Sequence, residues 1–114
     1  MDLEQIDFSG WQMKSLLFGL IHQTILPFNE KSMNISVGDK MKITFDSVPF
    51  KNYFLLVTNV TFTDLSKISN KDMFENGFIY KPSFISFMKD FRNIDEGSSV
   101  VKVDFKLREC DEYV

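Results

Sequence analysis

The chain has 114 residues, which fits a single domain spanning 1–114, and folding at this length buries about two-thirds of the unfolded surface. Thirteen basic and sixteen acidic residues give a net charge of -3, which excludes a protein that coats nucleic acid with its whole surface. The single Cys110 excludes an internal disulfide, and the single His22 cannot build a zinc site with it without several carboxylates, so we expect no metal, no cofactor and a cytoplasmic location.

The first predicted element is a helix over about 10–22. Ser9 with Gln12 three residues later is a capping-box pattern at its start. The stretch is interrupted by Lys14 and falls well short of the ~20 residues that span a bilayer, so we expect no membrane contact. Its apolar residues recur at helical spacing and predict a largely buried face: Trp11, Leu16 or Leu17, Leu20 and Ile21.

The middle of the chain alternates between strands and polar connections. A short strand is predicted over 24–28, followed by a polar loop over 29–36. After a glycine-aspartate turn, "KMKITF" (40–45) alternates apolar and polar residues as a half-buried strand does. A turn over 46–52 leads to a long strand over 53–62, which we expect to pair antiparallel with 40–45.

The remaining elements are short helices and a closing strand. Capped turns are predicted over 64–67 and 70–76, the second ended by Gly77. A helix follows over 81–91, and "VVKVDFKL" (100–107) alternates cleanly as a final strand. This order predicts an α+β fold, namely a small β-barrel of five or six mostly antiparallel strands with an N-terminal helix and short helices closing the ends.

Several stretches together resemble a known family. "VGDKMKITF", "FTDLSKISNKDMFENGF", "FISFMKDF" and "VVKVDFKL" are similar to the ASCH domain of the PUA-like superfamily, over about 8–107 and without the acidic tail 108–114. The resemblance implies a PUA-like pseudo-barrel with a cleft beside the first helix. In this family that cleft serves RNA or nucleoside ligands.

The same resemblance raises the question of catalysis. Some small bacterial members hydrolyse acetylated cytidine with a lysine, a threonine and a glutamate, and Thr24 and Glu75 fall at the last two positions. The family run G-x-K-T-x-T-x-R is replaced by "GLIHQTILP", which loses both cations. Amide hydrolysis needs an activated nucleophile or base, and His22 is the candidate substitute. Because both cations are absent, the sequence favours a module without catalysis, and whether the protein is an enzyme stays open.

Each candidate ligand-binding residue also has a structural interpretation. Glu75 and the neighbouring Asn76 would bind a base edge at the cleft, or Glu75 is a solvated acid near a helix end. His22 would bind ligand, or its protonated form would stabilise the C-terminal end of the first helix through the helix dipole. Trp11 would stack on a base, or it belongs to the core.

Lysines on the polar side of the predicted strands form a second candidate surface for nucleic acid. Lys40, Lys42 and Lys51 would form a basic stripe along the first hairpin, joined by Lys102 and Lys106 if the last strand lies alongside. The alternative is an ordinary solvated face, which alternation alone produces.

Three functions therefore stay open at the level of sequence. The first is an ASCH/PUA-like module that binds RNA or a modified nucleoside between the first helix and the barrel. The second is an amidohydrolase acting on acetylated cytidine with a degenerate site. The third is a phage-type interaction module or inhibitor that binds a host protein through its acidic ends.

Overall fold

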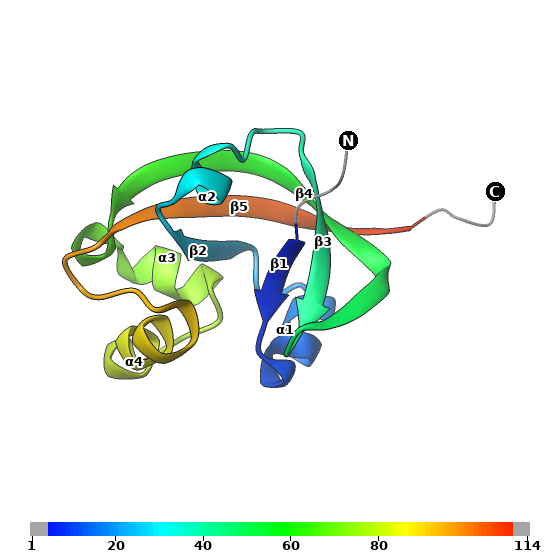
Figure 1. Cartoon of the computed structure of the whole chain (residues 1–114). Coiled ribbons are helices and arrows are strands. Elements are labelled where there is room, and N and C mark those ends of the chain that lie inside the picture. The colour runs from blue at the N-terminus through cyan, green and yellow to red at the C-terminus, as the bar shows by residue number, and fades with distance from the viewer. Residues whose placement is uncertain (1–4, 111–114) are drawn as a thin grey trace.

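A computed structural model describes residues 5–110, which form one five-stranded sheet and several short helices (Figure 1). The strands, in their spatial order, are β1 (Gln5–Phe8), β3 (Lys40–Phe45), β4 (Val48–Asp64), β5 (Ser99–Glu109) and β2 (Gln23–Pro27). β1 runs parallel to β3, and the other neighbours are antiparallel. The curled sheet makes a half-barrel, so the predicted small α+β fold with mostly antiparallel strands is confirmed, and it is consistent with a PUA-like barrel.

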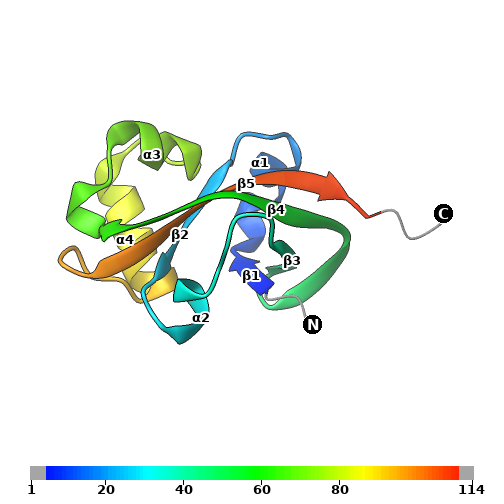
Figure 2. The ribbon, with the colours of Figure 1, turned by 90° about the horizontal axis from the view of Figure 1, so that it is seen from above.

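The helices are short and lie between the strands in the chain. They are α1 (Met13–Leu17) after a 3₁₀ turn at Gly10–Gln12, α2 (Glu30–Met33), a 3₁₀ turn at Leu65–Lys67, α3 (Asn70–Glu75) and α4 (Lys81–Arg92). Figure 1 shows β4 and β5 arching over α1, α3 and α4, and Figure 2 shows the same two strands crossing the top of the molecule. No helix within residues 5–110 has the length and apolar character needed to cross a membrane.

Strand alternation divides the buried side chains between two cores. Val101, Val103 and Phe105 of β5 face the barrel interior, as predicted, where they meet the alternate residues of β3. Val100 faces the other way and is also fully buried, because α3 and α4 cover that end of β5. The second core has its own set of residues: Ile25, Leu65, Met73, Phe78, Phe84, Met88, Ile94 and Val100.

The prediction of one buried helix over 10–22 was wrong. The helical residues end at Leu17, and Gly19 with φ +75° reverses the chain soon afterwards. Leu16 is fully buried, whereas Trp11 is 55% exposed and Leu20 is 63% exposed. The capping contact at the start is present, since the Ser9 backbone N–H donates to Gln12 Oε1 at 2.9 Å.

Two elements of the structure were not predicted from the sequence. β1 was not predicted, because four residues are too few to show a period. The polar stretch 29–36 contains α2, which begins where Asn29 Oδ1 accepts from the backbone N–H groups of Lys31 and Ser32, each at 3.0 Å.

The hairpin turn is also shorter than predicted. Asp46 and Ser47 both have positive φ and connect β3 directly to β4, as in the two-residue turns that suit twisted hairpins. At the other end, Arg108 and Glu109 belong to β5, and the last four residues of the predicted acidic tail lie outside the described range.

Candidate functional site

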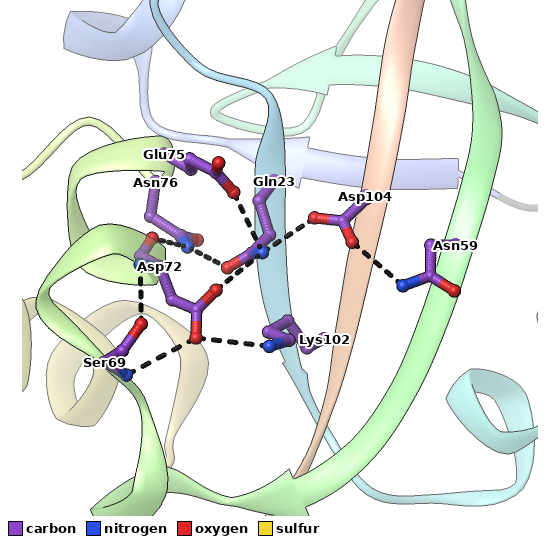
Figure 3. A network of polar contacts seen from close by, with 8 residues as sticks. All are labelled: Gln23, Asn59, Ser69, Asp72, Glu75, Asn76, Lys102 and Asp104. Atoms are coloured by element: carbon purple, nitrogen blue, oxygen red, sulfur yellow. Dashed lines mark hydrogen bonds and ion pairs between the residues drawn. The ribbon is translucent and has the colours of Figure 1, made fainter.

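A buried glutamine on β2 organises a polar network beside α3 (Figure 3). Gln23 is only 2% exposed, and its Nε2 donates to Asp104 Oδ1 at 2.7 Å, Asp72 Oδ1 at 3.2 Å and Glu75 Oε2 at 3.3 Å. Its Oε1 accepts from Asn76 Nδ2 at 2.8 Å. An amide nitrogen carries two protons, so three carboxylates compete for two donors.

Local sequence places these partners. Gln23 lies directly opposite Asp104 in the β2–β5 register. Ser69 Oγ accepts from the Asp72 backbone N–H at 3.1 Å and thereby starts α3, whose single turn brings Asp72 and Glu75 to the same side. Asn76 is 4% exposed and therefore serves as a fixed structural partner of Gln23.

Asp72 is a carboxylate of this network that several donors stabilise. Its Oδ2 accepts from Lys102 Nζ at 3.1 Å, in an ion pair whose side chains are 20% and 15% exposed. Burial raises the pKa of Asp72, but hydrogen bonds from Gln23, Lys102 and Ser69 outweigh it and hold the pKa below its ordinary value. The site therefore keeps a negative charge at neutral pH.

An open hollow of about 420 Å³, here called the Gln23 hollow, lies over this network. His22 and Glu75, both candidate site residues, line it together, and the His22 backbone N–H donates to the Glu75 carbonyl at 2.9 Å. Three lysines also line it: Lys71, Lys102 and Lys106. These lysines come from α3 and β5, and no local motif indicates that they meet here.

Thr24 does not line the Gln23 hollow. Consecutive strand residues point to opposite faces, so Thr24 and Gln23 diverge. The Thr24 hydroxyl is buried and accepts from Arg92 Nη2 at 3.1 Å. The structure therefore brings together His22, Glu75 and Asn76 but places Thr24 elsewhere.

Arg92 is a half-buried cation at the end of α4 that the sequence did not indicate. Its guanidinium lies 4.9 Å from the Phe91 ring centroid and 5.9 Å from that of Phe8. Burial lowers the pKa of Arg92 to about 10, partly opposed by the charge of Asp7. The contact with Thr24 joins residues 68 positions apart, so no spacing rule could have found it.

Trp11 lies away from the Gln23 hollow. Its ring meets Phe78 edge-on at 5.6 Å and Phe87 edge-on at 5.7 Å between centroids. The ring packs on these residues but is half-exposed, so Trp11 is not a core residue, and stacking on a base stays a prediction.

The three lysines of the first hairpin do share one concave surface. Lys40, Lys42 and Lys51 line a hollow of about 410 Å³, here called the lysine hollow, together with Phe50, Tyr53 and Phe54.

The aromatic rings of this hollow contact one another and a lysine. Phe50 and Tyr53 are parallel, with centroids 5.6 Å apart. Lys40 Nζ lies 5.5 Å from the centroid of Phe54. Lys102 and Lys106 line the Gln23 hollow instead.

Metal ligation has no geometric basis in the described part of the chain. Among residues 5–110, no three His, Cys, Asp or Glu side chains are grouped so that they could hold a metal ion. Lys102 and the amide of Gln23 already occupy the carboxylates of the network.

The fold is similar to the crystal structure of protein EF3133 from Enterococcus faecalis V583. The family model named for that protein is DUF984. The TM-score is 0.70 at 14% sequence identity, with 96% of this chain and 82% of that chain covered. The likeness shows the fold alone. The sequence matches no family model and no curated protein.

Proposed function

We propose that the protein is an ASCH/PUA-like module that binds single-stranded RNA at the lysine hollow. The observation that carries this proposal is the grouping of Lys40, Lys42 and Lys51 with three aromatic rings around one hollow. Cations that follow a phosphate backbone, combined with rings on which bases stack, are the features of surfaces that bind single strands.

The energetics favour local binding. Stacking on an aromatic ring contributes about 1–3 kcal/mol per base, and each phosphate contact adds a salt-dependent term through counterion release. Because the net charge is -3, this attraction must come from the hollow and not from the molecule's whole field. The resemblance to the ASCH domain supports the same ligand class.

The experiment measures anisotropy of a labelled single-stranded RNA at low salt. Lys42→Glu should weaken binding severalfold, because it reverses a charge inside the hollow. Lys89→Glu makes the same change of charge at an exposed position on α4 and should leave binding nearly unchanged. Absence of binding at low salt, or equal loss in both variants, contradicts the proposal.

A second candidate, a nucleoside amidohydrolase, is favoured by one observation. His22 and Glu75 line the same hollow as three lysines, which supplies a base, an acid and cations for an oxyanion. The test is acetate release from acetylated cytidine.

The variants of this test follow from the geometry. Glu75→Gln should abolish the release, whereas Thr24→Val should retain it, because Thr24 contacts Arg92 outside the hollow. Absence of acetate release from the unmodified protein removes this candidate.

A further inference from the structure

Two rows of side chains cross the sheet on the face opposite the barrel core. Lys40, Leu56 and Lys106 are direct partners across β3, β4 and β5. Residues directly opposite each other in adjacent strands project to the same face. Because the next residue along each strand, such as Met41 or Phe105, is buried in the barrel core, this row faces outward.

The second row lies two residues further along the strands and faces the same way. Lys42, Phe54 and Arg108 are direct partners across the same three strands. Lys42 and Arg108 are exposed, and Phe54 lies half-buried between them. The two rows on β3, β4 and β5 thus contain four cations, two apolar side chains and no carboxylate.

These rows connect the two hollows. Lys40 lines the lysine hollow, and Lys106 lines the Gln23 hollow. Strands lie about 4.8 Å apart, so the two lysines are separated by two strand spacings, or about 10 Å. Beyond Lys106 the next outward residue of β5 is Asp104, which belongs to the carboxylate network around Gln23.

We propose that the exposed face of β3, β4 and β5 is a track for single-stranded RNA, in which Lys106 and Arg108 bind phosphates and Phe54 stacks on a base. The track starts at Lys51 in the lysine hollow and stops at Asp104, whose charge repels phosphate. This proposal rests on the proposed function and adds Lys106 and Arg108 to the lysine hollow, which already contains Phe54.

Chemistry favours a single strand over other polyanions. The ring of Phe54 lies beside Lys42 and within 5.5 Å of Lys40 Nζ, so stacking and phosphate contact occur together. A duplex keeps its base faces covered and cannot use the ring. A lipid surface would use the cations without a requirement for the ring.

The test compares Lys106→Glu, Arg108→Glu and Phe54→Leu with the matched control Lys89→Glu. Each charge reversal should weaken binding of a single-stranded RNA severalfold. Replacement of either cation by alanine should lower the slope of log K against log salt by about 0.7, the share of one phosphate on a single strand. Phe54→Leu keeps an apolar side chain on β4 and should weaken single-stranded RNA more than duplex RNA.

Oligomer length gives an independent readout. Affinity for uridine oligomers should rise with length and then level off within about 4–16 nucleotides, the range covered by small single-strand-binding domains. Lys106→Glu with Arg108→Glu should shorten the length at which affinity levels off. Circular dichroism melting of each variant separates loss of binding from loss of folding.

The outcomes separate this proposal from the proposed function. Loss of binding in Lys42→Glu, with Lys106→Glu and Arg108→Glu unchanged, overturns the track and keeps the lysine hollow. No binding by the unmodified protein overturns the proposed function itself. Equal binding of duplex RNA, or a dependence on Lys106 and Arg108 seen only with anionic phospholipid vesicles, also overturns the track.

Discussion

Gln23 joins β2 to α3 and β5 through one buried amide. Its partners are 49 to 81 positions away in the chain, so their convergence depends on the complete fold. Alternation predicted that Asp104 faces away from the barrel core, but nothing local indicated that Gln23 would meet it. From sequence alone, a polar residue in a short strand is predicted to be exposed to solvent, because the helix that covers it is not yet known.

The lowered pKa of Asp72 makes the free energy of unfolding depend on pH. A carboxyl whose pKa is lower in the folded state contributes stability above its unfolded pKa, and loses it as pH falls through the folded pKa. The ordinary value is 3.8. Asp72→Asn should therefore cost about 1–2 kcal/mol at pH 7, and the difference should shrink as pH falls below 3.8 and through the lower pKa of the folded state.

Urea unfolding at pH 7, 5 and 3 measures this difference. Asp90→Asn is the control, because Asp90 is exposed on α4. A constant deficit of Asp72→Asn at all three pH values would show that the loss comes from packing and not from charge.

Thr24→Val tests the buried contact with Arg92. Valine keeps the volume of threonine but cannot accept the bond from Arg92 Nη2, so a half-buried cation loses an acceptor. We expect a loss of about 1–3 kcal/mol in the free energy of unfolding, measured by urea titration. Thr58→Val changes an exposed threonine of β4 and should stay within about 0.5 kcal/mol. Equal stability of both variants contradicts the role of Thr24.

At the scale of elements, periodicity identified those elements that are long enough to repeat. β3, β5 and α4 lie close to their predicted bounds, because each alternates or turns through several repeats. The prediction of the first helix was wrong because its apolar residues form two sets. Leu16 and Ile21 are buried, whereas Trp11 and Leu20 are exposed. Hydrophobicity alone does not reveal which side of a helix a sheet will cover.

The turn after α3 carries the clearest prediction at this scale. Gly77 has φ +90°, and a Cβ there would lie 3.1 Å from Ile21 Cγ1, which is buried in the barrel core. Gly77→Ala should therefore lower the melting temperature through both strain and contact, by the equivalent of about 1–2 kcal/mol. Gly97→Ala adds a Cβ with no atom within 4 Å and should change stability little. An unchanged melting temperature for Gly77→Ala contradicts this account.

At the scale of the whole molecule, the sequence predicted a shared face for the hairpin lysines but not the Gln23 hollow. Alternation placed Lys40 and Lys42 on one face before the fold was known, and the bulge in β4 brings Lys51 and the aromatic rings to them. The Gln23 hollow depends on α3 meeting β2 and β5, a tertiary contact that carries no period. The candidate residues of the cleft were therefore predicted individually, and their grouping was not.

Trp11 allows the two possible ligand positions to be distinguished in solution. It is the chain's single tryptophan, and it packs on Phe78 and Phe87 beside the first helix. Ligand bound in the lysine hollow should leave its emission unchanged while anisotropy reports binding, because Trp11 does not line that hollow. Ligand bound beside the first helix, as the family resemblance implies, should quench it. Unfolding in urea is the control, because it shows that Trp11 emission responds to its surroundings. Quenching by RNA would indicate a binding site beside the first helix and would contradict one on the basic face of β3, β4 and β5.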